Sequence, residues 1–316
     1  NLGASLAACE RNILLVDLDP QANATSGLGI SKNLEKSIYP VLTDGMNIRE
    51  VIVTTELPNL HVAPSAVDLV AAELELSDAI GREFYLRRAL QEVAKDYDYV
   101  LIDSPPSLGL LTINGLTAAN SVLVPMQCEY FAIEGVAQLV NTVERVRDML
   151  NPGLEIEGIA LTMYDERMNL ARQVAEEVRS HFGEKVYQTV IPRNVRLGEA
   201  PSFGKPVLMH DRDSRGALAY LALAGEIIRC DFSAYPNVAR WLGNMKRLPS
   251  WPKVNEALYG FEVRPVEGAW FDQEDDRGIA PVFEGAGDAN EIRGRTDLLD
   301  RLEQLAEAFQ SKKFAL

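Results

Sequence analysis

Aspartate side chains follow two short apolar runs, and their type and spacing suit phosphoryl-transfer chemistry. Asp17 and Asp19 follow residues 13–16, and Asp103 follows residues 99–102. Such runs form strands buried in a parallel sheet, and open α/β sheets bind ligands at the carboxyl ends of their strands. Phosphoryl transfer needs Mg²⁺ held near a strand-end carboxylate and an oriented water molecule. Capping or turn-forming aspartates are the alternative explanation of the same pattern.

The elements that would position these acids alternate from residue 1 to about residue 229. Four apolar runs are short, continuous and rich in β-branched residues, namely 13–16, 99–102, 121–125 and 158–162. Within residues 170–182, apolar side chains recur every four positions with charged residues opposite, which predicts an amphipathic helix. This alternation predicts an α/β fold with a doubly wound, mostly parallel sheet and right-handed crossovers.

Charge and composition exclude several classes of protein. The formal net charge of −15 argues against a surface that is basic throughout and coats nucleic acid, although a local basic patch remains compatible with it. Cys9, Cys128 and Cys230 have no paired spacing, which favours isolated thiols over a metal or disulfide role. No apolar run approaches the roughly 18 residues of a membrane span, and no signal peptide is visible. We expect a cytoplasmic protein without membrane contacts.

The first eight residues read as the middle of a helix, with no N-cap signal ahead of them and Asn rather than Met at position 1. This pattern is typical of a sequence that starts inside an element. We expect an N-terminal truncation of a longer domain.

Composition changes near residue 230, where the α/β alternation stops. Residues 235–251 and 253–259 resemble the closing helices of a glutathione S-transferase C-terminal domain, with an apolar stripe of Val238, Trp241, Leu242 and Met245. A helical appendage that packs on the main domain is the alternative interpretation. Residues 262–316 read as an acidic linker with a terminal helix from about residue 291. We therefore expect three parts, at 1–229, 230–261 and 262–316, the last two forming a helical and irregular tail.

Several motifs in order resemble one family of nucleotide-dependent switches. Asp-Leu-Asp-Pro-Gln at 17–21, followed by Asn-Ala-Thr-Ser-Gly-Leu-Gly at 23–29, resembles the segment after the deviant Walker A loop of the ParA/Soj and MinD family. Asp-Ser-Pro-Pro-Ser-Leu-Gly at 103–109 resembles that family's Walker B and switch region. Further matches lie at 125–132, 191–197, 200–206 and 212–217. From residue 1 to about residue 229, the chain is similar to a ParA/Soj-type partitioning ATPase.

This resemblance implies ATP and Mg²⁺ as cofactors and a role for each matching residue. Asp19 would orient the attacking water, and Asp17 would support the Mg²⁺ shell and the switch. Asp103 would be the Walker B acid, which contacts Mg²⁺ through water. The adenine would be bordered by Pro192, Arg193 and Asn194.

The segment from residue 193 to residue 215 contains five basic and three acidic residues, and a solvated surface also explains this small surplus of positive charge. The basic residues are Arg193, Arg196, Lys205, Arg212 and Arg215. The resemblance implies DNA binding without sequence preference, through Arg196, Lys205 and Arg215, with a steep salt dependence. It also implies an ATP-driven homodimer, a ParB-type partner that stimulates hydrolysis, and a nucleoid-associated location.

Members of this family carry a Lys-Gly-Gly-Val-Gly-Lys-Thr-Thr loop upstream of the segment that matches Asn1, where backbone N–H groups and lysines hold the phosphates. The printed sequence shows neither this loop nor the first strand, which is normally central in the sheet. We therefore expect a P-loop NTPase-like fold without that strand and loop, and defective ATP binding. A non-catalytic interaction module and a transferase relative are the competing hypotheses.

Overall fold

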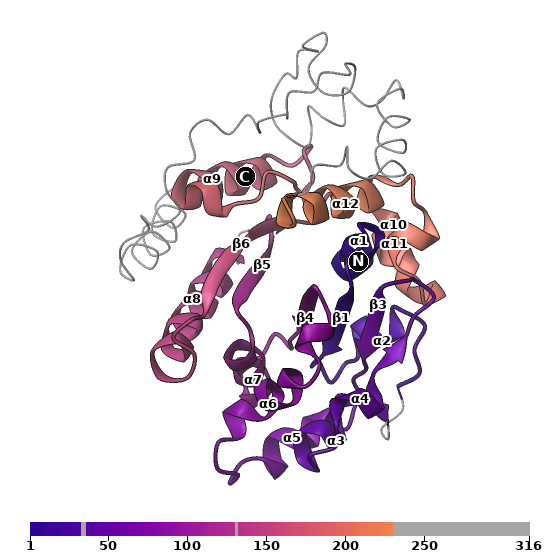
Figure 1. Cartoon of the computed structure of the whole chain (residues 1–316). Helices are drawn as coiled ribbons and strands as arrows, with labels where there is room; N and C mark the ends of the chain where they lie inside the picture. The colour runs from indigo at the N-terminus through magenta and orange to yellow at the C-terminus, as the bar shows by residue number, and fades with distance from the viewer. Residues whose placement is uncertain (33–35, 130–131, 230–316) are drawn as a thin grey trace, which may run out of the picture. The chain divides into compact units, whose positions relative to one another are not determined.

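The computed structural model describes residues 1–32, 36–129 and 132–229 (Figure 1). Contacts divide the chain into two compact units, Asn1–Cys230 and Asp231–Leu316. The transferase-like stripe, the acidic linker and the terminal helix expected beyond residue 229 lie outside the described residues. The division of the chain into three parts therefore stays a prediction.

A four-stranded sheet is built around β1 (Ile13–Asp17). β1 pairs in parallel with β3 (Leu60–Ala63) on one side and with β4 (Tyr99–Asp103) on the other. The short strand β2 (Val53–Thr54) runs antiparallel to β3 and completes the order β2-β3-β1-β4. The expected α/β fold with a mostly parallel sheet is therefore confirmed.

A second sheet consists of two parallel strands, β5 (Ser121–Gln127) and β6 (Glu155–Thr162). Within the described part of the chain, β4 is the last strand of the first sheet and β5 the first strand of the second. The two sheets stand apart in Figure 1, with β4 and β5 as the strands nearest the gap between the ribbons. Each of these strands thus presents a backbone edge that no other described strand pairs.

Helices connect and cover the strands. The α-helices are α1 (Leu2–Ala8), α2 (Asn23–Ser26), α3 (Ile38–Thr43), α4 (Ile48–Val51), α5 (Leu69–Glu75), α6 (Tyr85–Gln91), α7 (Leu110–Ala118), α8 (Ala132–Met149), α9 (Asn169–Phe182), α10 (Val195–Glu199), α11 (Val207–His210) and α12 (Arg215–Ile227). Short 3-10 turns lie at η2 (Arg82–Phe84), η3 (Ala94–Asp96), η4 (Gly183–Lys185) and η5 (Ala200–Phe203). The predicted amphipathic helix is confirmed as α9, and it buries Val174, Val178 and Phe182.

Successive side chains of β1 enter two different cores, because side chains in a strand alternate between its faces. Ile13 packs with α1 and Leu60, whereas Leu14 and Val16 pack with residues of α3 to α7. Ile13, Leu14 and Val16 are fully buried. This two-sided burial explains why the run is continuously apolar, and it fixes the position at which the polar end of the strand emerges.

Among the described residues, no helix has the length and apolar character needed to cross a membrane.

Candidate functional site

The aspartates at the ends of β1 and β4 lie next to each other. Asp17 and Asp103 are register partners in the parallel ladder, and the Leu18 N–H donates to the Asp103 carbonyl oxygen at 2.7 Å. Both residues stand at the carboxyl ends of their strands, where open α/β sheets bind ligands. The predicted meeting of two strand-end acids at one edge is therefore present in the structure.

Asp17 is fully buried, and three hydrogen bonds hold its carboxylate. Thr25 donates to Oδ2 from its backbone N–H at 2.8 Å and from its hydroxyl at 2.7 Å. The Asp19 N–H donates to Oδ1 at 3.2 Å. Burial raises the pKa of Asp17 above its usual value, although these hydrogen bonds oppose the shift. The carboxylate is thus fixed in place at some electrostatic cost.

Thr25 also connects this carboxylate to the segment that follows β3. The backbone N–H of Ser65 donates to the Thr25 hydroxyl oxygen at 2.9 Å, and both residues are fully buried. The Thr25 hydroxyl therefore accepts from one chain segment while it donates to another. Thr25 belongs to a sequence motif, but the sequence alone gives it no role, because threonine is common in short helices and only the fold reveals its two partners.

Asp19 lies in a tight turn directly after β1. Its Oδ1 accepts from the Gln21 N–H at 2.9 Å, its carbonyl oxygen accepts from the Ala22 N–H at 2.8 Å, and Ala22 adopts a left-handed conformation with a φ of 52°. The turn-forming explanation therefore holds for one carboxylate oxygen. The side chain is half-buried, and its Oδ2 accepts no hydrogen bond from a described residue.

The Asp103 side chain is exposed, and no described residue donates a hydrogen bond to its carboxylate. The protein around it removes part of its hydration, and with the negative charges of Asp17 and Asp19 this raises the pKa of Asp103 to about 6. Negative charge at this edge is therefore incompletely compensated by the described residues, a condition that favours a cation.

The donor set suits Mg²⁺, a hard cation that prefers oxygen ligands and retains several waters. No group of three or more His, Cys, Asp or Glu side chains in the described ranges is arranged to hold a metal ion. A Mg²⁺ held by Asp103 and Asp17 would therefore take most of its ligands from water and phosphate, which fits the predicted contact through water.

The three residues expected to border adenine lie beside the carboxyl end of β6. Pro192 forms a parallel bridge with Tyr164, and the Arg193 N–H donates to the Tyr164 carbonyl oxygen at 2.8 Å. The Asn194 side chain caps α10 by accepting from the Arg196 N–H at 2.9 Å. Within the described ranges, no hydrogen bond or ion pair joins these three residues to the aspartates, and their adenine role stays a prediction.

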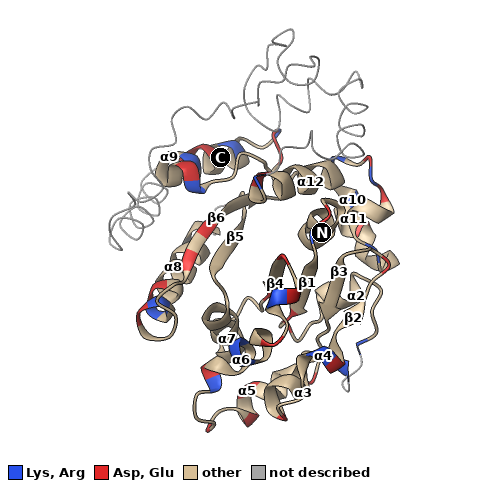
Figure 2. Ribbon diagram, viewed as in Figure 1, with Lys and Arg blue, Asp and Glu red and all other residues tan. Residues whose placement is uncertain are grey.

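The predicted DNA-binding cations each face a carboxylate. Arg196 contacts Glu199 at 2.8 Å and Asp211 at 3.1 Å. Lys205 lies 3.8 Å from Glu56, and Arg215 lies 4.0 Å from Glu166. These groups lie on or beside α10, η5 and α12, where Figure 2 shows blue and red residues interleaved. The positive charge of these three residues is thus paired with carboxylates, and their role in DNA binding stays a prediction.

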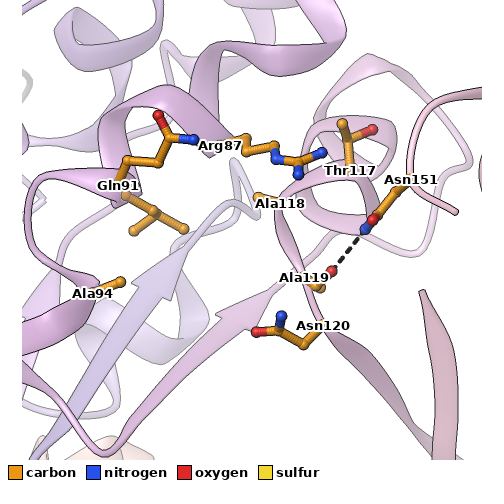
Figure 3. A pocket seen from close by; sticks show the side chains of 9 residues that line it. Arg87, Gln91, Ala94, Thr117, Ala118, Ala119, Asn120 and Asn151 are labelled. Carbon is orange, nitrogen blue, oxygen red and sulfur yellow. Dashed lines mark hydrogen bonds between the residues drawn. The ribbon is translucent and has the colours of Figure 1, made fainter. Parts of the chain in front are cut away.

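A pocket of about 170 Å³ lies away from the aspartates, where α6 and α7 end and before β5 begins (Figure 3). Arg87 and Gln91 line one side, while Asn151 donates from Nδ2 to the carbonyl oxygens of Leu116 and Ala119. These bonds satisfy carbonyl groups at the end of α7, a capping role that is structural. The pocket contains no carboxylate, and we assign it no part in phosphate chemistry.

Comparison with known proteins decides the family. A family model described as an AAA domain matches residues 1–156. The sporulation initiation inhibitor protein Soj of Bacillus subtilis is 56% identical over 228 residues, which cover 72% of this chain and 90% of Soj. The chain belongs to the ParA/Soj family of chromosome-partitioning ATPases. The family resemblance predicted from the motifs is therefore confirmed.

A second curated relative and a solved structure also resemble this ParA/Soj-family chain. The chromosome partitioning protein ParA of Myxococcus xanthus is 53% identical over 237 residues, which cover 75% of this chain and 84% of that protein. A crystal structure of cobyrinic acid a,c-diamide synthase from Mycobacterium smegmatis, with bound ADP and magnesium, superposes with a TM-score of 0.63 at 36% identity. That match covers 74% of this chain and 88% of the other, so the ParA/Soj-family fold extends over most of the described unit.

Proposed function

We propose that the described unit is the body of an ATP-dependent switch that dimerises with ATP, binds DNA without sequence preference and responds to a ParB-type partner. The observation that carries this proposal is the juxtaposition of Asp17 and Asp103 at adjacent strand ends, with the Asp19 N–H bonded to Asp17. A solved relative with bound ADP and magnesium supports a nucleotide and Mg²⁺ as ligands.

Each aspartate has a distinct place in this proposal. The free Oδ2 of Asp19 accepts a hydrogen bond from the attacking water and orients it, because phosphoryl transfer is catalysed mainly by positioning and charge. Asp103 and Asp17 would hold Mg²⁺ through its water shell, and the ion would supply positive charge beside the phosphate oxygens. Thr25 keeps Asp17 in position through two hydrogen bonds. Pro192, Arg193 and Asn194 border the adenine ring.

DNA binding in this proposal uses Arg196, Lys205 and Arg215. Because each of these cations faces a carboxylate, DNA phosphates must compete with Glu199, Asp211, Glu56 and Glu166 for them. Exposed ion pairs of this kind contribute about 0 to 1 kcal/mol each, so phosphate groups can displace them at modest cost. The resulting affinity depends on salt, since it rests on phosphate contacts and counterion release. A nucleoid-associated location follows from such binding.

The phosphates themselves need backbone N–H groups and lysines, which the family supplies from its Gly-rich loop. In the described residues, the first sheet has an unpaired edge at β4 and the second sheet has one at β5, and such edges accept a further strand. We propose that the strand leading to that loop pairs there, and that nucleotide binding depends on the strand and loop together.

Calorimetry with ATP and magnesium tests the proposal. The experiment compares the 316-residue chain with an extended chain that carries the family's strand and Lys-Gly-Gly-Val-Gly-Lys-Thr-Thr loop upstream. We expect the extended chain to bind ATP and the 316-residue chain to bind it weakly or not at all. If neither binds while circular dichroism shows both to be folded, the switch proposal is wrong, and the alternative of an interaction module without ATP turnover stands.

A further inference from the structure

One helix of the unit exposes apolar side chains together with an excess of acidic charge. On α5 and the turn before it, Val67, Val70 and Leu74 are 62%, 58% and 77% exposed. Their spacing of three and four residues places them on one face of the helix. The opposite face, formed by Leu69, Ala72 and Leu76, is buried in the core. The helix is thus anchored on one side and presents an aliphatic stripe on the other.

This stripe continues toward the loop that follows β4. The Leu111 N–H donates to Glu73 Oε1 at 3.3 Å, and Gly109 lies against the same carboxyl group, which brings the loop onto α5. Leu108 in that loop is 45% exposed. Ile80, beyond the end of α5, is 96% exposed. Four of the ten large hydrophobic side chains that are exposed on the described residues therefore lie on α5, on the turn before it or in the loop packed against it, whereas single exposed apolar residues need no explanation.

The charge of the region is of one sign. Between Glu50 and Gly81 the sequence contains no Lys or Arg, while Asp68, Glu73, Glu75 and Asp78 all lie on or next to α5. Glu73 and Glu75 are partly engaged, by the Leu111 N–H and the Tyr39 hydroxyl respectively. The carboxylates of Asp68 and Asp78 belong to exposed residues and make no hydrogen bond or ion pair with a described residue. Figure 2 shows the α5 segment with red and without blue.

We propose that the α5 surface, defined by Val67, Val70, Leu74, Leu108, Asp68 and Asp78, docks a basic amphipathic segment of a partner protein. Apolar side chains at helical spacing on that segment would cover the aliphatic stripe, and its Lys or Arg residues would pair with the acids. A second copy of this chain fits less well. In a twofold contact the same surface of each copy meets the other, and the acids Asp68 and Asp78 of one copy would then lie close to those of its partner.

The probe is a fluorescent 18-residue peptide of Leu and Lys at helical period, with a control peptide of the same composition in scrambled order. Anisotropy measures binding to the full chain and to Val70→Ser/Leu74→Ser. Met149→Ser, at a 76% exposed apolar position on α8, is the matched control. We expect the dissociation constant to rise at least tenfold in the double variant and to stay within twofold in the control. Asp68→Asn/Asp78→Asn should weaken binding several-fold at low salt, whereas Glu176→Gln on α9 should not.

Hydrogen exchange locates the contact independently, and the amides of residues 67–76 should gain protection when the peptide binds. Equal binding of the scrambled peptide, or equal losses in the α5 and control variants, would overturn the proposal. Sedimentation of the parent chain provides a further test. Self-association that Val70→Ser/Leu74→Ser abolishes would assign the surface to a second copy and would contradict a basic partner.

Discussion

The Thr25 hydroxyl joins two chain segments around the buried carboxylate of Asp17. It donates to Asp17 Oδ2 at 2.7 Å and accepts from the Ser65 N–H at 2.9 Å. Thr25→Val keeps the shape of the side chain but leaves both partners short of one hydrogen bond. An unsatisfied buried group costs roughly 1 to 3 kcal/mol, and more when it is charged. The site therefore depends on a residue that takes no part in the chemistry.

We expect Thr25→Val to lower the free energy of unfolding by about 2 to 4 kcal/mol, measured by urea denaturation at pH 7. Thr25→Ser retains the hydroxyl and should lose less than half as much. If the two variants are equally stable, the hydroxyl does not hold Asp17, and the assigned positioning role is wrong.

Asp103 gives the unit a defined pH dependence. Its pKa is raised from 3.8 to about 6, so the folded state binds a proton more readily than the unfolded chain. Stability from this group is therefore lowest at pH 7 and above, and it increases as the pH falls through 6 toward 4. Asp103→Asn removes this dependence.

Urea unfolding at pH 7 and at pH 5 should show Asp103→Asn more stable than the parent at pH 7, with a smaller difference at pH 5. Asp165→Asn is the control. Its carboxylate pairs with Arg167, which lowers the pKa of Asp165 to about 2, so its contribution is lost only below about pH 4. A stability difference for Asp103→Asn that does not change between pH 7 and pH 5 would contradict the shifted pKa.

At the level of secondary structure, the apolar runs predicted β1, β4, β5 and β6, because strands buried on both faces must be continuously apolar. β3 was not predicted, since it is only four residues long, includes His61 and follows a Pro58-Asn59 turn. The meeting of Asp17 with Asp103 followed from strand ends alone. The partners of Thr25 did not, because they depend on the position of Ser65 forty residues away.

The basic region depends on close packing between α12 and α10. A Cβ atom on Gly216 would lie 2.6 Å from Leu197 Cγ, whereas a Cβ on Gly198 would meet nothing within 4 Å. Gly216→Ala should therefore destabilise the unit by about 1 to 3 kcal/mol through overpacking. Gly198→Ala should be neutral or stabilising by up to about 1 kcal/mol, since Ala favours helix. Thermal denaturation of the two variants tests this expectation. A Gly216→Ala variant as stable as the parent would show that α10 and α12 can move apart at little cost, which would contradict the expected overpacking.

The ion pairs of Arg196 predict a direct effect on DNA affinity. Glu199→Gln frees the Arg196 guanidinium from a 2.8 Å contact and should strengthen binding to a random-sequence duplex several-fold. Arg196→Ala should weaken binding to all sequences alike and reduce the salt slope by about 1. Glu176→Gln on α9 changes the net charge equally and serves as the control. Equal gains from both glutamate variants would indicate a general charge effect and would exclude a specific role for Arg196.

The unit as a whole combines a buried parallel sheet, a strand-end acid cluster and a largely paired basic region, with a net charge of −15 over the chain. Its two sheets end at β4 and β5 without pairing to each other. Soj of Bacillus subtilis matches across 72% of the chain at 56% identity, so the family assignment rests on the described unit. We propose that the acids at the ends of β1 and β4 position the water and the magnesium ion for ATP hydrolysis.

Magnesium-dependent ATP hydrolysis by the extended chain, compared between Asp19→Ala and Asp165→Ala, tests this claim most directly. Both residues follow strands, but only Asp19 belongs to the acid cluster. We predict that Asp19→Ala lowers kcat about 100-fold or more and changes ATP affinity only a few-fold, because the residue orients water and does not hold the nucleotide. Asp165→Ala should hydrolyse ATP at the parent rate. Parent-like turnover by Asp19→Ala would contradict the account.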